Sequence, residues 1–376
     1  MDNEAEVDDQ SDLSAALGLT KKVMLGVIQR VSQRLERGEH LPHVSLPQDK
    51  AAFPKMLSLD QNHWIYLSQA NLGLNGQQDR LGGALAAIRA ATATGRLLVP
   101  VLGTNALEVG EHRDAGRRER LAKFMVDVSG NLSALNHIIT RSFELRSAMS
   151  RHYCGAVTET PIRSNLVQRA MYAAVSGRTP SGNTGDSTMD RLLTESLFEP
   201  EVSAAALAHV ASREMIATFR ERDIEGARFV EGVRAIDADL TTQRRRLLEL
   251  RNVLSGGSLA KRLEPIQLDL GIDPAQFKSW LDTDENLLRL IDDVPSLDVT
   301  ATLMLERDRN RDHRTHRNDG KDFSFLDVAI PYANIVVAER SWASIARSSG
   351  LADKYGTAVS ADAAELPELL QRAGCI

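Results

Sequence analysis

The segment Met56-Leu-Ser-Leu-Asp-Gln-Asn-His-Trp-Ile-Tyr-Leu67 decides how this chain is expected to fold. Four mostly apolar residues, typical of a buried strand, run into Asp60, and a helix-like pattern begins at once. The carboxyl ends of strands in an open α/β sheet face a crevice, and an unpaired carboxylate buried there is costly. We therefore expect Asp60 to have a partner, either a bound cation or the N-terminus of the following helix, which Asp often caps.

Three further acids occupy similar junctions. Glu108 follows the apolar run Leu97–Leu102 by a few residues, Asp322 stands just before a helix-like stretch, and Glu339 ends the strand-like run Asn334–Ala338. Each has an ordinary alternative role, as a helix cap, a solvated helix residue or a surface ion-pair partner. Taken together with Asp60, their positions favour one shared site for a divalent cation with oxygen ligands.

The pattern around these acids is that of an α/β protein. An Ala-rich stretch, Leu81–Thr94, predicts a helix that crosses from the first strand to the second and stops at Gly95. Near the end of the sequence, Thr357–Val359 predicts a short last strand and Ala364–Arg372 a last helix. Because parallel strands need crossover connections, we predict a mainly parallel sheet flanked by helices.

Three motifs carry a family resemblance: LSLDQNHWIYLSQA (57–70), LLVPVLGTNALEVG (97–110) and NDGKDFSFLDVAIPYANIVVAER (318–340). In this order they resemble PIN-like domains, a family of metal-dependent ribonucleases. The resemblance covers about residues 55–125 and 315–376. The sequence departs from the family pattern in having Glu339 where Asp is more typical, and in the long gap between Glu108 and Asp322.

The resemblance implies a metal site made by four catalytic acids: Asp60, Glu108, Asp322 and Glu339. Either Asp319 or Asp327 is an alternative to Asp322 as the ligand. The cofactor implied is Mg²⁺ or Mn²⁺, which lowers the pKa of a bound water and neutralises charge on a scissile phosphate. The expected activity is that of an endoribonuclease hydrolysing RNA phosphodiester bonds, in the role of a toxin or defence effector.

The expected domain organisation has three parts. Residues 1–18 form a disordered acidic tail. Residues 19–128 and 303–376 form the PIN-like α/β domain, which includes an amphipathic N-terminal helix. Residues 129–302 form a large helical insertion, whose most mobile part is the polar loop 176–186.

Helical periodicity divides the later part of the insertion into separate helices over Glu201–Arg220, Ile224–Val253 and Pro274–Asp292. The long segment Ile224–Val253 carries apolar residues at helical spacing, so it is the candidate surface for a protein partner or an antitoxin. A homodimer is also compatible with the sequence.

Two arginine-rich segments are candidates for binding RNA. Arg307, Arg311 and Arg314 would share one face of a helix that runs into the acidic motif near Asp322. Arg117 belongs to a second patch, on the helix that follows Glu108. Each segment has two possible roles. It is either an ordinary solvent-exposed helix of mixed charge or a surface that binds phosphate groups.

Composition limits the remaining possibilities. A net charge of −6 argues against coating nucleic acid through bulk electrostatics. The two cysteines, Cys154 and Cys375, are too few for a disulfide framework or a zinc site. No apolar run approaches the roughly 20 residues of a membrane span. We therefore expect a cytoplasmic protein that does not enter a membrane.

A second class of function remains open on the sequence alone. The chain is alternatively a catalytically inactive PIN-like scaffold that binds a protein through its helical insertion. A phosphohydrolase with Asp60 as nucleophile is disfavoured, because that class carries a second Asp two residues later and this sequence has Asn62.

Overall fold

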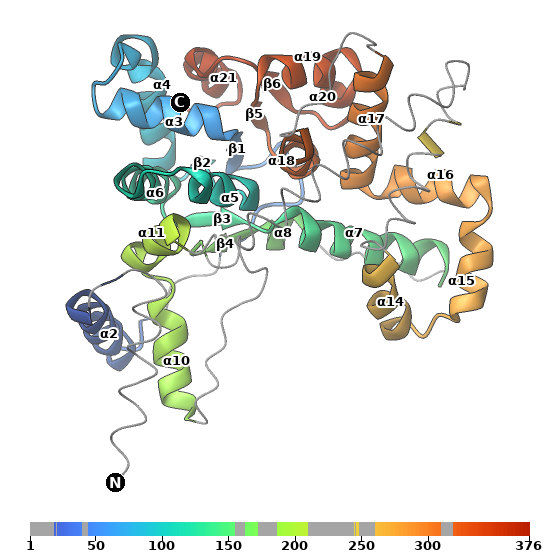
Figure 1. The fold of residues 1–376 in the computed structure, drawn as a ribbon, viewed down its shortest axis with the longest axis horizontal. Coiled ribbons are helices and arrows are strands. Elements are labelled where there is room, and N and C mark those ends of the chain that lie inside the picture. The colour runs from blue at the N-terminus through green and yellow to red at the C-terminus, as the bar shows by residue number, and fades with distance from the viewer. Residues whose placement is uncertain are drawn as a thin grey trace. The chain divides into compact units, whose positions relative to one another are not determined.

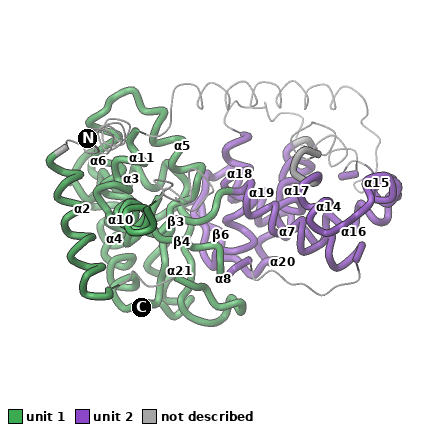
Figure 2. Tube along the Cα trace, turned by 90° about the horizontal axis from the view of Figure 1, so that it is seen from below, with its two compact units in different colours: residues 1–136, 164–218, 362–376 green, residues 137–163, 219–361 purple. Residues whose placement is uncertain are grey.

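The computed structural model describes residues 19, 21–39, 44–154, 162–171, 186–209, 244, 246–247, 260–309 and 319–376. Several expected features lie outside this part of the chain: the acidic tail, nearly all of the loop 176–186, residues 210–220 and most of the segment Ile224–Val253. The described residues form two compact units, coloured separately in Figure 2. Unit 1 consists of residues 1–136, 164–218 and 362–376, and unit 2 of residues 137–163 and 219–361.

Unit 1 contains these elements in chain order (Figure 1): α2 (Lys21–Glu36), β1 (Lys55–Leu59), α3 (Gln61–Asn71), α4 (Gln77–Ala93), β2 (Leu97–Leu98), α5 (Gly103–Glu111), α6 (Ala115–Ser129), β3 (Leu132–Ala134), β4 (Val167–Arg169), α10 (Ser187–Ser196), α11 (Pro200–His209), the 3₁₀ turn η1 (Ala363–Glu365) and α21 (Leu366–Arg372). A short helix, α8 (Ile162–Leu166), leads into β4.

Unit 2 contains α7 (His137–His152), α14 (Ala260–Asp269), α15 (Pro274–Leu281), α16 (Asp284–Asp293), α17 (Pro295–Arg309), α18 (Asp319–Tyr332), β5 (Ile335–Val337), α19 (Arg340–Ser348), α20 (Leu351–Lys354) and β6 (Ala358–Ser360). Both units are mostly helical, with short strands. None of the described helices combines the length and the apolar character that a membrane crossing requires.

The strands of unit 1 form a parallel pair and an antiparallel pair. β1 is buried at every position and runs parallel to β2, with Met56 opposite Leu98. The α3–α4 pair supplies the crossover between these strands, as a parallel connection requires. Beyond β2, Val101 makes a parallel bridge to Ser133 of β3, and β3 pairs antiparallel with β4.

Helices cover these strands through apolar contacts. α3 packs against α4 and α6, where the ring of Trp64 lies edge-on to that of Phe124 at 6.3 Å between centroids. α11 packs against α5 and α6. The N-terminal helix α2 is joined to α10 by Arg34, which pairs with Glu195 at 3.3 Å and with Glu199, between α10 and α11, at 2.6 Å. Arg30 of α2 pairs with Glu201 of α11 at 2.8 Å.

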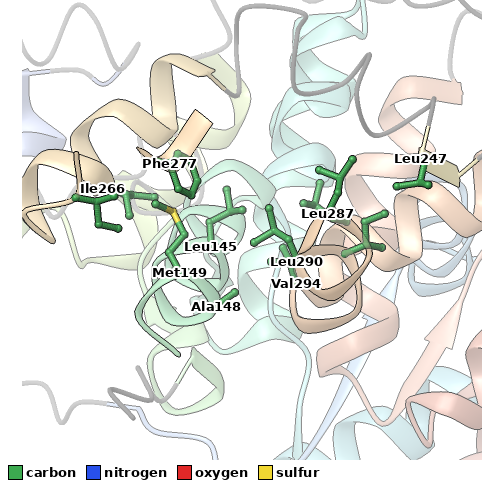
Figure 3. Close-up of a cluster of buried hydrophobic side chains, with 12 residues drawn as sticks. Leu145, Ala148, Met149, Leu247, Ile266, Phe277, Leu287, Leu290 and Val294 are labelled. Atoms are coloured by element: carbon green, nitrogen blue, oxygen red, sulfur yellow. The ribbon is translucent and has the colours of Figure 1, made fainter. Parts of the chain in front are cut away.

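In unit 2, β5 and β6 form a second parallel pair, with Val336 opposite Val359. An apolar cluster of this unit surrounds α7, against which α14, α16, α17 and α18 pack. Figure 3 shows Leu145 and Met149 of α7 among side chains from α14, α15 and α16. On α15, the rings of Phe277 and Trp280 stack with 5.8 Å between their centroids and pack against this cluster.

The expected broad class is confirmed: helices flank short parallel strands. Strands lie at the four places where the sequence predicted them, as β1, β2, β5 and β6, and the amphipathic N-terminal helix is α2. The boundaries expected for a PIN-like domain and its insertion remain a prediction.

Two expectations about helix boundaries are wrong. The helix expected over Pro274–Asp292 is two helices, α15 and α16, because Asp282 and Thr283 interrupt it. α18 begins at Asp319, so Asp322 lies in its first turn rather than ahead of it. The antiparallel pair of β3 and β4 was not expected from the sequence.

A buried polar network occupies the interior of unit 2. Glu144 of α7 accepts hydrogen bonds from the Tyr332 hydroxyl at 2.5 Å and from the backbone N–H of Ser296 at 3.1 Å. Arg141, one turn away, pairs with Asp327 of α18 at 2.6 Å. Burial raises the pKa of Glu144 to about 6 and that of Asp327 well above its ordinary value, and the guanidinium of Arg141 offsets only part of each rise.

This network predicts that acidification stabilises the folded chain through Glu144. At pH 7.5 its carboxyl is ionised in both folded and unfolded chains. At pH 5 the folded chain holds the proton, whereas the unfolded chain, with a pKa near 4.5, mostly does not. Relative to Glu144→Gln, the wild type should therefore gain about 1 kcal/mol between pH 7.5 and pH 5, as measured by chemical denaturation.

Glu285→Gln is the control for this measurement, because Glu285 is exposed on α16 and pairs only at the surface with Arg289. It should show no comparable gain. A wild type that loses stability relative to Glu144→Gln on acidification would contradict the assignment of a proton to this network.

Candidate functional site

Asp60 leaves the buried strand β1 and caps α3. Its Oδ1 accepts a hydrogen bond from the backbone N–H of His63 at 3.0 Å, and the Nδ1 atom of the His63 ring lies 2.5 Å from the same oxygen. The residue is 7% exposed. The capping role expected as the alternative for Asp60 is therefore present, and it uses one carboxylate oxygen.

The other oxygen, Oδ2, is buried and has no hydrogen-bond partner in the described part of the chain. Several neighbouring residues share this property. Buried and unpartnered atoms also occur at the side chains of Ser58 in β1, of Gln61 and Trp64 in α3, and of Thr104 and Asn105 in α5. We call these six residues (Ser58, Asp60, Gln61, Trp64, Thr104 and Asn105) the β1–β2 polar edge.

Topology explains why these groups belong to one edge. β1 and β2 are parallel neighbours, so the helices that follow them, α3 and α5, both begin beyond the carboxyl ends of the strands. α3 and α5 also contact each other. A buried polar atom without a partner costs about 1–3 kcal/mol, so a group of them at a strand edge calls for bound water or a ligand.

Asn105, in the first turn of the helix that follows β2, resembles Asp60 in having one side-chain atom hydrogen-bonded and the other unpartnered. Its Oδ1 accepts a hydrogen bond from the backbone N–H of Leu102 at 3.2 Å, while its Nδ2 is left unpartnered among the described residues. Glu108 follows one turn later on α5, where it is partly buried. The spacing places Glu108 on the same face of α5 as Thr104 and Asn105.

The acids expected from the end of the sequence lie in unit 2. Asp322, partly buried, accepts a hydrogen bond from the indole N–H of Trp342 at 2.9 Å. Glu339 follows β5 as expected and stands at the N-cap position of α19, where it is exposed and its side chain makes no capping hydrogen bond. The two alternatives to Asp322 are paired with arginines: Asp319 with Arg307 and Asp327 with Arg141.

The four expected metal ligands are thus divided between the units, with Asp60 and Glu108 in unit 1 and Asp322 and Glu339 in unit 2. Within the residues that the structure describes, no three His, Cys, Asp or Glu side chains gather as a metal ion would require. The oxygen that fits a cation best is Oδ2 of Asp60, which is buried and unpartnered.

The arginines expected to bind RNA separate into different environments. Arg307 is 1% exposed, pairs with Asp319 at 3.2 Å and lies over the ring of Phe323, so it belongs to the interior of unit 2 and not to an exposed phosphate-binding face. Arg311 and Arg314 lie outside the described residues. Arg117 is exposed on the first turn of α6.

Sequence reasoning missed Gln61, Thr104 and Asn105 as site residues. A usable signal was present, because polar residues occupy the first turn of the helix after each of the first two strands. Gln, Thr and Asn are common in loops and helix starts, so that signal has meaning only once the two strands are known to be neighbours.

No family model, curated protein or solved structure matches this chain. Among its own residues, those of the β1–β2 polar edge have the geometry and chemistry of a candidate functional site.

Proposed function

We propose that this chain is a Mg²⁺- or Mn²⁺-dependent ribonuclease in which Asp60 is the principal metal ligand. One observation carries the proposal: a carboxylate oxygen, buried at the carboxyl end of a parallel strand, has no partner among the described residues. An ionised carboxylate in such a place is stabilised by a cation, and carboxylate oxygens are the ligands that Mg²⁺ and Mn²⁺ prefer.

The residues of the polar edge supply the rest of the proposed chemistry. The bond from the His63 N–H holds Oδ1 of Asp60, so the carboxylate is fixed in orientation while Oδ2 stays available. The unpartnered amides of Gln61 and Asn105 are neutral donors suited to phosphate oxygens or to an attacking water. A bound divalent ion would lower the pKa of that water and offset the phosphate charge.

Glu108 is the second proposed ligand because it follows Thr104 and Asn105 on the same helix face. The roles of Asp322 and Glu339 as further ligands are carried by the sequence resemblance alone. RNA as the substrate is likewise a proposal that rests on the resemblance.

A non-catalytic scaffold is the second candidate. It is favoured by the absence of any three-residue metal cluster within the described residues and by the capping bond of Asp60, which is sufficient reason for an Asp at this position. The two candidates differ in what Asp60 contributes beyond its cap.

Replacing Asp60 by Asn tests the ribonuclease directly. Asn caps a helix about as well as Asp but removes the charge that the cation needs. Mn²⁺-dependent cleavage of an RNA substrate should fall by two or more orders of magnitude, while the melting temperature without metal stays unchanged or rises, because a buried charge is removed.

Asp79→Asn is the matched control, since Asp79 lies exposed in the first turn of α4 in the same unit. It should cleave like the parent. If Asp60→Asn cleaves as fast as the parent, or the parent cleaves no RNA with either cation, the scaffold candidate replaces the ribonuclease.

Metal binding itself gives a second prediction that needs no substrate. A ligand that binds only the folded chain stabilises it by mass action, so millimolar Mn²⁺ should raise the melting temperature of the wild type. The same addition should leave Asp60→Asn nearly unchanged, and Asp79→Asn should behave as the wild type. An equal shift in wild type and Asp60→Asn would assign the ion to another place.

A further inference from the structure

Helix α5 of unit 1 begins in the interior, and its N-cap side chain offers no hydrogen-bond acceptor. The N-cap residue is Leu102, which is 2% exposed. The next three residues, Gly103, Thr104 and Asn105, are buried as well. Water accepts the first N–H groups of an exposed helix, whereas a buried helix start needs acceptors from the protein or from a ligand.

The backbone groups just ahead of α5 are all engaged. Val101 is fixed by two backbone hydrogen bonds of 2.9 Å to strand β3. The N–H of Leu102 donates to Oδ1 of Asn105 at 3.2 Å, and its carbonyl accepts from Ala106 at 3.2 Å. The N–H groups of residues 103–105 come next, and none of them has an acceptor among the residues that the structure describes.

Two buried side-chain donors belong to the same turn. Oγ1 of Thr104 and Nδ2 of Asn105 have no partner in the described part of the chain, and the two residues are 5% and 1% exposed. The atom of Asn105 that faces the N–H of Leu102 has to be the amide oxygen, since only the oxygen accepts. The amide therefore lies back over the amino end of α5, and its Nδ2 is held there as a donor.

We call residues 103–105 the α5 donor turn. Each of its unpartnered groups can donate a hydrogen bond, and only the Thr104 hydroxyl can also accept one. The amino end of a helix adds a positive partial charge of about half an elementary charge. A water molecule bound there would bring two donors of its own and meet few acceptors. An anion matches both the donors and the charge.

We propose that the α5 donor turn binds a phosphate group. Phosphate oxygens are strong acceptors, and N–H groups at helix starts are common ligands for them. Gly103 has no side chain, so an oxygen can approach the backbone closely. Glu108 is on the same side of α5 as Thr104 and is only partly buried, which brings solvent close to the turn.

The carboxylate of Asp60, at the end of the neighbouring strand β1, opposes an anion in this region. A divalent cation at Asp60 would remove that opposition, so phosphate and cation should strengthen each other's binding. This coupling, and any use of the turn in phosphodiester cleavage, rests on the proposed function. The phosphate site itself is argued from the donors of α5.

Thermal melting of the full chain in EDTA, with inorganic phosphate or with sodium chloride at the same ionic strength, tests the site. Millimolar phosphate should raise the melting temperature of the wild type by about 2 °C or more relative to chloride. Thr104→Val removes one donor. Asn105→Asp puts a negative charge in place of another, while its second oxygen can still accept from Leu102. Both variants should lose most of the phosphate shift.

Melting without phosphate separates this role from a structural one. Thr104→Val should then melt no lower than the wild type, because it removes a buried hydroxyl that has no described partner. If Thr104 served only the fold, the variant would melt lower and keep the full phosphate shift.

The source of the phosphate is tested with dimethyl phosphate, a diester with two unesterified oxygens. A shift with both inorganic phosphate and dimethyl phosphate would support the site and assign it to a phosphodiester. A shift with inorganic phosphate alone would support the site and assign it to free phosphate.

Thr188→Val is the matched control. Thr188 holds the same second position of α10, where Asp186 already accepts from its backbone N–H at 2.7 Å. It should keep the phosphate shift of the wild type. No phosphate shift in the wild type, or equal shifts in the wild type, Thr104→Val and Asn105→Asp, would overturn the proposal. Because EDTA removes divalent cations, these outcomes are separate from a failure of the metal site at Asp60.

Discussion

The hydrogen bond between Oδ1 of Asp60 and the backbone N–H of His63 is the interaction on which the candidate site depends. The chain leaves a strand that is buried at every position and starts a helix at the next residue, so the first helical N–H groups need an acceptor at once. Ser or Thr would satisfy that need with a single oxygen. A carboxylate brings a second oxygen and a charge, and neither is used by the cap.

The arginines of this chain have two kinds of role, and contacts distinguish them. Arg34, Arg118 and Arg141 hold helices together through carboxylates or carbonyl groups. Arg113, Arg117 and Arg120 are exposed and make no ion pair with a described residue.

Sequence reasoning succeeded where a short-range pattern determines the structure. The strand at Met56–Leu59 and the cap at Asp60 follow from apolar residues that run into a side chain able to accept N–H bonds. Sequence reasoning failed where contacts with other residues determine whether a side chain is buried. Arg307 stands in a run of alternating charge that is typical of a solvated surface, yet it is buried because Asp319 and Phe323 receive it. The apolar periodicity also predicted one helix across Asp282 and Thr283, although Thr283 is the N-cap residue of a new helix.

Helix α18 is held from several directions by the polar contacts already described. Asp322 is bound by Trp342 of α19, Asp327 by Arg141 of α7, and Tyr332 donates to Glu144, also of α7. These residues lie at different angles around the helix, since each position advances by 100°. Rotation of α18 about its axis would break at least one buried polar contact, so its rotational register is locked. A turn of the Asp322 carboxylate about the axis of α18 must therefore come from its own side-chain torsions and not from rotation of the helix.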